Sequence, residues 1–290
     1  MNKIYSTLQK LGLTSKRSRI KFSKKTRDKE KQNVWLDKKS GVIYIDDYYV
    51  GDNEYELGNY RDNKKKITGD PSFERLEDAN RRISFCKKFI KNKTILEFGC
   101  GNGDFLFLAK RISKEITGIE LQTDYRKYIQ SKKIKCFRNF EELEKKKFDV
   151  ILSFHVVEHL PDPINEIKKL RTFLSSKGKI IIEVPHANDF LLTHAKVESF
   201  KDFTLWSQHL ILHTKDSLFK LLKSVGFKKI NIDGIQRYNI ANHMNWLINN
   251  KSGGHKSYLA KLENRQIKKE YANFLSKLNA NDTLIAIADK

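Results

Sequence analysis

The sequence predicts an α/β fold, with a seven-stranded and mostly parallel sheet and helices on both faces. Apolar runs of strand length alternate with helical patterns between residues 94 and 184. Two further runs, at 227–233 and 283–288, supply the last two strands. Such an alternation is typical of parallel sheets whose strands are joined by right-handed crossovers. An N-terminal extension precedes this region, and a helical insertion precedes its last strand.

Local patterns place the elements in chain order. Apolar residues recur at helical spacing from Phe73 to Ile90, which predicts a helix before the sheet. The expected strands of the alternating region are 94–98, 115–120, 134–137, 148–153 and 179–184. The expected helices between them are 104–112, 123–131, 141–145 and 164–175. Later helices are expected at 214–225, where Gly226 ends the pattern, and at 241–249 and 256–278 in the insertion.

The chain divides into three segments by composition. These are a basic N-terminal arm at 1–32, a cap or lid segment at 33–79, and the α/β domain at 80–290, whose insertion at 236–281 is expected on the substrate side. Residues 1–31 contain eleven Lys or Arg against two acidic residues. They predict either a disordered basic arm or a peripheral helix around Ile4, Leu8 and Leu11 with a basic tail. In the cap segment, Val42–Ile45 predicts a short strand.

The composition limits the class of protein. The 290 residues suit one α/β domain of roughly 150–200 residues with extensions. A run of about 18 apolar residues and an apolar signal region are both absent from the sequence, which argues against a transmembrane helix and a secretory leader. Cys86, Cys100 and Cys136 have no C-x-x-C spacing. They indicate a reducing, cytoplasmic compartment and argue against a metal site.

The net charge of +22 has two interpretations. The first is a generally lysine-rich composition, with mild attraction to anionic substrates or to the inner face of a membrane. The second is binding to nucleic acid. The sequence shows no module of interleaved aromatic and basic residues, which argues against nucleic acid. The basic arm suits contact with a membrane surface or an acidic partner, and no pattern indicates an oligomeric state.

A glycine-rich turn, Glu97-Phe98-Gly99-Cys100-Gly101-Asn102-Gly103-Asp104, joins a strand to a helix. Glycines there allow positive φ and let the backbone approach a ligand closely. A dinucleotide fingerprint needs its third glycine at position 104, where Asp104 stands, and a P-loop needs Gly-Lys-Ser/Thr. Glu120 ends the second strand, about 20 residues beyond the first loop glycine, where an acid accepts hydrogen bonds from ribose hydroxyls. The turn and the acid together predict a nucleotide site.

A third motif follows the fourth strand, in the segment Ser153–Pro163 with its Glu158-His159 pair. Together with the E-x-G-x-G-x-G turn and Glu120, this segment resembles the motifs of class I S-adenosylmethionine (SAM) dependent methyltransferases. The resemblance runs from about residue 80 to 290. It implies a Rossmann-like sheet of order 3-2-1-4-5-7-6, with strand seven antiparallel, and SAM as the cofactor.

The resemblance also implies which residues contact SAM. On the methionine side these are Glu97, Gly99, Gly101 and Gly103, with Cys100 in the same loop. Around the ribose and adenine they are Glu120, Leu121, Asn139 and Phe140. Toward the sulfonium and the acceptor they are Phe154 and His155, with Ser153 just before them.

A finer resemblance concerns the acceptor. Leu205–Leu210, 236–243 and 253–255 resemble the tail of bacterial methyltransferases from sugar and surface-polysaccharide pathways. This implies a saccharide or nucleotide-linked sugar as the small-molecule acceptor. Many of those relatives carry a cysteine-rich zinc module, but residues 35–60 contain no cysteine. Gln208 stands where sugar C-methyltransferases carry a glutamate, which favours methylation of a hydroxyl.

A hydroxyl acceptor has to lose a proton, and histidine suits that task near neutral pH. The candidate bases are His155, His209 and His186, whereas His159, four residues after His155, is expected to pack or cap. An anionic part of the substrate is expected to meet Arg61, Lys64–Lys66, Arg237 or His255. The tyrosine-rich acidic segment 48–60 predicts either a lid over the cofactor or a surface loop.

Two alternative functions remain open from the sequence. One is a methyltransferase that acts on RNA or another anionic acceptor, which the basic arm favours. An Asn/Asp-Pro-Pro-Tyr motif, typical of base N-methylation, is absent after the fourth strand. The other is a non-catalytic binding protein with the SAM fold, against which the loop glycines and Glu120 argue.

Overall fold

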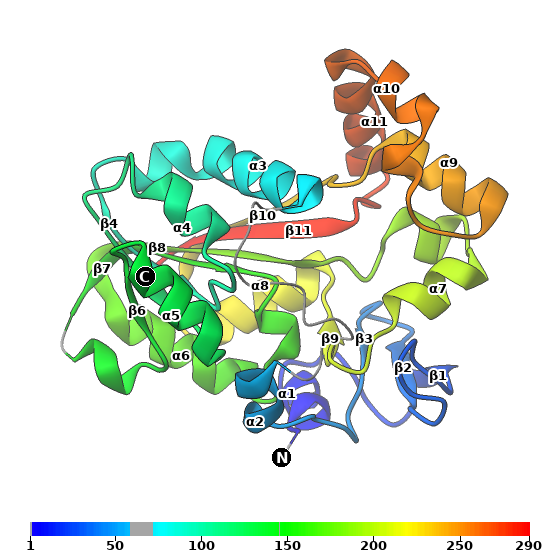
Figure 1. The fold of residues 1–290 in the computed structure, drawn as a ribbon. Coiled ribbons are helices and arrows are strands. Elements are labelled where there is room, and N and C mark those ends of the chain that lie inside the picture. Colours follow the sequence, from blue (N-terminus) through cyan, green and yellow to red (C-terminus); the bar gives the residue numbers. More distant parts are fainter. Residues whose placement is uncertain (1, 59–71, 145) are drawn as a thin grey trace.

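A seven-stranded sheet forms the centre of the computed structural model, which describes residues 2–58, 72–144 and 146–290 (Figure 1). Its strands are β4 (Thr94–Phe98), β5 (Glu115–Ile119), β6 (Lys135–Phe137), β7 (Phe148–Phe154), β8 (Leu174–Pro185), β10 (Lys228–Ile235) and β11 (Thr283–Asp289). They lie in the order β10-β11-β8-β7-β4-β5-β6. Strand β11 runs antiparallel to both of its neighbours, and the pairs from β8 to β6 are parallel. The predicted fold class and strand order are confirmed.

Helices cover both faces of this sheet. On one face lie α3 (Phe73–Ile90), α4 (Asp104–Ala109) and α5 (Thr123–Ser131), and on the other lie α6 (Pro163–Phe173) and α8 (Lys215–Ser224). Successive residues of a strand point to opposite faces. Ile180 and Ile182 therefore pack beneath α6 and α8, whereas Ile181 packs on the side of α3 and α4. This double burial explains why the strands are continuous apolar runs.

Capping residues set several helix boundaries. Ser72 accepts a hydrogen bond from the Arg75 N–H and starts α3, and Asp162 does the same for the Asn165 N–H ahead of α6. The helix predicted at 141–145 is a short 3-10 helix at Glu141–Leu143, and residue 145 lies outside the described residues. Strand β8 begins at Leu174 and so takes the last two residues of the helix predicted at 164–175.

The N-terminal segment differs from the predicted arm. It contains α1 (Ile4–Lys10), β1 (Arg19–Ser23), β2 (Val34–Asp37) and β3 (Ile43–Tyr44), and these strands join β9 (Ile211–Leu212) in a second, antiparallel sheet. Ile4 and Leu8 are buried against Tyr44, as in the helical alternative. Instead of a basic tail, however, residues 19–23 form β1 by antiparallel pairing with β2, and Arg19 also pairs with Asp46 at 2.6 Å. Figure 1 shows this region (blue) folded beside β9.

The insertion is helical, as predicted. It contains α9 (Ile240–Asn249), α10 (Tyr258–Leu262) and α11 (Arg265–Lys277), which stand together at one end of the sheet (Figure 1). The single helix predicted at 256–278 is wrong because Asn264 caps α11, accepting a hydrogen bond from the Ile267 N–H at 2.9 Å. The remaining α-helices of the described residues are α2 (Asp52–Leu57) and α7 (Glu198–Thr204). Among the described helices, none is both long and apolar enough to cross a membrane.

Candidate active site

The glycine turn lies at the carboxyl end of β4, where open α/β sheets bind their ligands. Gly99, Gly101 and Gly103 all have positive φ. A Cβ on Gly99 would lie 2.4 Å from Val156, and one on Gly103 would lie 2.8 Å from Ile129. A Cβ on Gly101 would meet no described atom within 4 Å. Two of the glycines therefore allow close packing, and the third leaves backbone open to a ligand.

Glu120 is fixed beside this loop. Its carboxylate accepts hydrogen bonds from the Gly101 N–H at 2.7 Å and from the Gln122 N–H at 2.8 Å. The side-chain oxygens of Gln122 and Asn139 are buried without a hydrogen-bond partner in the part of the chain that the structure describes. Polar atoms thus gather after β5 and β6, where the resemblance implies ribose and adenine.

Glu97 supplies a further polar atom at the end of β4. Its side chain is only 4% exposed, and its Oε2 has no partner among the described residues. Burial raises the pKa of Glu97 to about 8, against the opposing effect of Arg82. These groups fit three parts of SAM. The buried Glu97 oxygen fits the ammonium group, the open backbone at Gly101 fits the methionine chain, and the fixed Glu120 carboxylate fits the ribose.

The two phenylalanines that the resemblance implies as SAM contacts, Phe140 and Phe154, lie in the core. Phe140 stacks between Phe98 and Phe173, at centroid distances of 5.2 and 5.6 Å, and is 8% exposed. Phe154 packs edge-on against Phe105. Both rings belong to the core, so the structure does not turn their faces toward the open side of the site.

The other implied residues vary in exposure. Ser153 is buried, and its Oγ has no partner among the residues described. Leu121 is half-buried after β5. Cys100 turns inward, with its Sγ 3.8 Å from that of Cys136, and all three cysteines are free.

His155 follows β7 and has a positive φ of 55°. Its Nδ1 lies 3.1 Å from Glu158, and its Nε2 lies 3.3 Å from Glu183 and 3.2 Å from the guanidinium of Arg237. Burial and Arg237 lower the pKa of His155, but the two carboxylates outweigh them and raise it. Because each ring nitrogen already faces a carboxylate of the protein, His155 is poorly placed to take a proton from an acceptor.

The other two candidate bases lie in different settings. His186 is 2% exposed, and its Nδ1 lies 2.9 Å from the Asn281 carbonyl, so it is enclosed at the end of β8. Burial lowers the pKa of His186 to about 4. His209 is half-buried in the loop before β9, beside the ring of His159 at a centroid distance of 5.1 Å. The structure therefore brings His155 and His209 to one side of the site and keeps His186 apart.

A buried ion network lies behind His155. Glu183 accepts hydrogen bonds from Arg81 and Arg82, at distances between 2.8 and 3.0 Å. Asp78 contacts Arg81 at 3.1 Å and Arg237 at 3.1 Å. Sequence reasoning missed this network, because the arginines of α3 carry no motif that predicts their partners.

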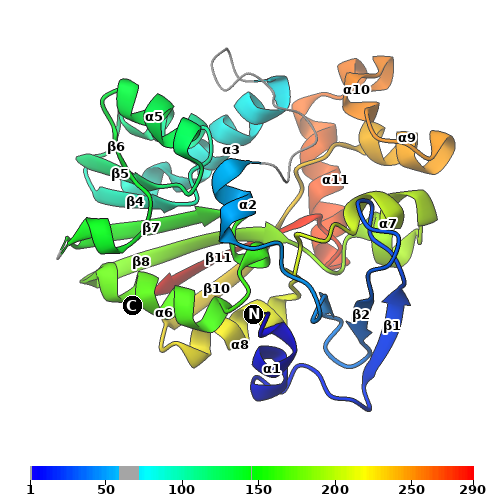
Figure 2. The same ribbon diagram turned by 60° about the horizontal axis from the view of Figure 1, so that its bottom comes forward.

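Helix α2 lies beside the carboxyl ends of the strands (Figure 2). Its Tyr55 hydroxyl donates to the Gln208 side chain at 2.8 Å, and its Glu56 pairs with Arg138 at 2.8 Å. The predicted lid segment 48–60 thus contains a helix that joins the cofactor side to the acceptor side, and residues 59 and 60 lie outside the described residues. Neither contact was apparent from the sequence.

A cleft of about 400 Å³ separates α3 from the insertion. Its basic lining residues are Arg237, His255, Lys256, Lys261 and Lys268. Two of the side chains expected to meet an anion already have acidic partners, since Arg237 pairs with Asp78 and His255 with Glu74, the latter at 2.9 Å. Arg61 and Lys64–Lys66, the other expected anion contacts, lie outside the described residues.

A family model described as a methyltransferase domain matches residues 72–232. The chain belongs to the methyltransferase-domain family. The match includes the glycine turn, Glu120 and the Glu158-His159 pair, so the predicted enzyme class, a methyltransferase, is confirmed at the level of this domain, and the residues at the site keep SAM as the expected cofactor.

Two curated relatives match part of the chain. The tRNA U34 carboxymethyltransferase of Nautilia profundicola is 26% identical over 162 residues, which cover 51% of this chain and 52% of the relative. The ubiquinone biosynthesis O-methyltransferase of Hydrogenovibrio crunogenus is 30% identical over 119 residues, covering 37% of this chain and 49% of the relative. The chain therefore spans about half the length of these relatives.

Solved structures support the same fold. A SAM-dependent methyltransferase from Archaeoglobus fulgidus superposes with a TM-score of 0.50 at 20% identity, covering 74% of this chain and 94% of that one. A Haemonchus contortus phosphoethanolamine N-methyltransferase 2, solved with SAM, gives a TM-score of 0.52 at 15% identity, covering 86% and 61%. At this identity the similarity concerns the fold and leaves the acceptor open.

Proposed function

We propose that this protein transfers a methyl group from SAM to a hydroxyl of a small molecule, with a saccharide or nucleotide-linked sugar as the acceptor. The observation that carries this proposal is a polar group beside the glycine turn. Val156 packs on Gly99, and the chain continues directly into Glu158 and His159, with His209 next to them. Carboxylate and imidazole groups suit the orientation and deprotonation of a hydroxyl.

SAM, when bound, supplies an activated methyl group whose transfer needs no protonation of the leaving group. The chain has to align the acceptor, which contributes about 7–11 kcal/mol in well-oriented reactions, and remove one proton. Of the three candidate bases, His209 has the best position, because His155 is held between carboxylates and His186 is enclosed. Burial lowers the pKa of His209 to about 3, so it would act as a weak base. The insertion supports a substrate role because it forms one wall of the cleft.

RNA is the second candidate acceptor. Two observations favour it: the net charge of +22 and the similarity to proteins named tRNA U34 carboxymethyltransferases. Neutralising phosphates releases counterions, so binding of RNA would weaken steeply as salt rises, whereas binding of a neutral sugar would not.

We expect the purified protein to methylate a saccharide or nucleotide-linked sugar when it is incubated with radiolabelled SAM and panels of sugars, nucleotide sugars and tRNA. The product would carry an ether-linked methyl group, identified by mass spectrometry and NMR. Transfer to tRNA alone, with a steep salt dependence of tRNA binding, would replace the sugar proposal by the RNA one.

Glu120→Gln tests the cofactor site. We expect SAM to bind about 10–100-fold more weakly, because a hydrogen bond to a charged group contributes about 1.5–3 kcal/mol. Isothermal titration calorimetry would measure the dissociation constant. Glu115→Gln is the matched control, since Glu115 starts the same strand and is 41% exposed beside Lys146. Equal affinity in the two variants would remove Glu120 from the cofactor site.

A further inference from the structure

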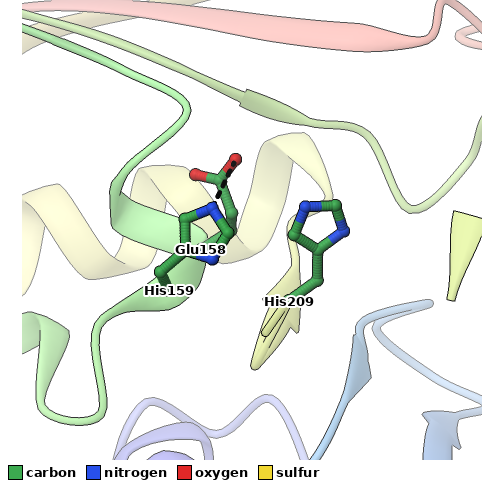
Figure 3. Close-up of side chains that lie close together, drawn as sticks. All are labelled: Glu158, His159 and His209. Atoms are coloured by element: carbon green, nitrogen blue, oxygen red, sulfur yellow. Dashed lines mark ion pairs between the residues drawn. The ribbon is translucent and has the colours of Figure 1, made fainter. Parts of the chain in front are cut away.

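Three potential metal ligands converge at one point beyond the end of β7. Glu158 and His159 belong to the 3-10 turn after that strand, and His209 comes from the loop before β9. One ligand atom from each lies within 4.8 Å of those of the other two. Figure 3 shows the carboxylate above the two imidazole rings, with the three side chains directed toward a common space. We call these residues the Glu158 cluster.

Glu158 is ready to act as an anionic ligand. Its side chain is fully buried, and its Oε2 has no hydrogen-bond partner among the described residues. Burial raises the pKa of Glu158, but the hydrogen bond from His155 and the electrostatic effect of the neighbouring histidines outweigh it and hold the pKa at about 2. A buried carboxylate oxygen without a partner is costly unless a cation or a donor meets it.

His159 is oriented for a metal. Its Nδ1 donates to the Gln208 carbonyl at 2.8 Å, which leaves the lone pair on Nε2. That Nε2 lies 4.0 Å from Glu158 Oε1 (Figure 3). Histidines that bind metals are held in the same way, with the second ring nitrogen donating to a carbonyl or carboxylate.

His209 completes the set in its neutral form. Burial and the neighbouring His159 lower the pKa of His209 to about 3, so its ring keeps a lone pair throughout the neutral range. Its Nδ1 is buried with no hydrogen-bond partner in the described ranges. A group of such low basicity is a weak proton acceptor, but neutral imidazole is the form that metals bind.

We infer that the Glu158 cluster binds one divalent transition-metal ion, such as Zn²⁺, Mn²⁺ or Co²⁺. Two imidazoles and one carboxylate are ligands that these ions accept, and three protein ligands leave coordination positions open. The ligand atoms are more widely spaced than on a bound ion at about 2.1 Å, so binding draws the side chains inward. The expectation of no metal rested on cysteine spacing, and this cluster contains no cysteine.

The inference deepens the proposed function and rests on it for the role of the ion. An acceptor hydroxyl at an open position would have its pKa lowered by the ion, and its proton would pass to water. His209 would then be a ligand instead of the base. His155, which contacts Glu158 at 3.1 Å, would position the carboxylate.

Metal binding by the full chain tests the inference directly. The protein is stripped with a chelator and titrated with Zn²⁺, Mn²⁺, Co²⁺ and Mg²⁺ by calorimetry, and the Co²⁺ form is examined for visible absorption. We expect one equivalent of transition metal and a Co²⁺ spectrum that indicates nitrogen ligands. His209→Gln and His159→Gln should each weaken binding by about 100-fold or more, because loss of a ligand exceeds loss of an outer hydrogen bond.

His194→Gln is the matched control, since His194 is exposed and lies outside the cluster. It should bind metal as the wild type does, and circular dichroism and SAM titration would show that each variant is folded. Three results would overturn the inference: no metal bound by the wild type at millimolar concentration, unchanged affinity in folded cluster variants, or binding of Mg²⁺ alone. Intact SAM binding without metal binding would overturn only this inference, whereas metal binding without SAM binding would overturn the proposed function.

Discussion

Gly99→Ala is expected to destabilise the fold by about 2–5 kcal/mol. The φ of Gly99 is +72°, where an L-residue costs roughly 1–2 kcal/mol. The new Cβ would lie 2.4 Å from Val156 Cγ2, and overpacking of this kind costs about 1–3 kcal/mol. The free energy of unfolding from urea titration would measure the sum.

Gly101→Ala separates the two contributions. Gly101 also has a positive φ, of 52°, but its Cβ would meet no described atom within 4 Å. We expect a loss of only about 1–2 kcal/mol in stability, together with weaker SAM binding because the open side of the turn is filled. Adding Val156→Ala to Gly99→Ala should restore part of the stability. Equal losses in both single variants would show that Val156 moves aside freely.

The sheet could be predicted because its strands are buried on both faces. Leu96 and Ile180 pack on one side, and Ile95 and Ile181 on the other, so each strand is a continuous apolar run. Strand boundaries were less certain for a physical reason. Strand β8 begins at Leu174, which pairs with Phe148, and a register irregularity separates this pair from the regular pairing that starts at Lys179.

The N-terminal sheet illustrates what local patterns miss. Its edge strand β9 is two residues long and pairs Ile211 with Tyr44, far away in the chain. The excess of Lys and Arg predicted an arm, yet Leu8 and Leu13 are buried beneath those cations. A few apolar residues in a basic segment can anchor it when a distant strand supplies the partner surface.

In the candidate site, too, local features could be predicted from the sequence and features that depend on distant residues could not. The glycine turn and Glu120 are close in sequence and carry a known spacing, so their contact in the structure could be predicted. The charge states of the histidines depend on distant partners, as with Glu183 beside His155 and His159 beside His209. His159 was expected to pack or cap, and its contact with the Gln208 carbonyl agrees with that expectation. The Glu-His dipeptide is the sequence signal for its role in the inferred metal site.

Glu183→Gln is expected to destabilise the fold by about 3–5 kcal/mol. Glu183 is fully buried and faces Arg81, Arg82 and His155, with five contacts between 2.8 and 3.3 Å. Removing one member of a buried ion network leaves its partners uncompensated, which costs about this much. Glu166→Gln is the control, because Glu166 pairs with the exposed Lys169 and such surface pairs contribute about 0–1 kcal/mol.

Glu183 should also make the free energy of unfolding depend on pH. The arginines and His155 hold the pKa of Glu183 well below its usual value, and Arg237 holds that of Asp78 at about 2 despite burial. As the pH falls, these carboxyl groups are therefore protonated in the unfolded chain before they are protonated in the folded protein. Stability from these groups is complete above about pH 4.5 and is lost as the pH falls through the lowered native pKa values, near 2 for Asp78.

Urea titrations of the wild type and Glu183→Gln between pH 3 and 7 would measure this dependence. The curve of Glu183→Gln should lie lower at neutral pH and fall less steeply below about pH 4, because one of the depressed carboxyl groups is gone. The two curves should therefore converge in acid. Parallel curves would mean that Glu183 keeps an ordinary pKa and that other groups compensate the charge of the arginines. The loss of stability in Glu183→Gln would then come from packing rather than charge.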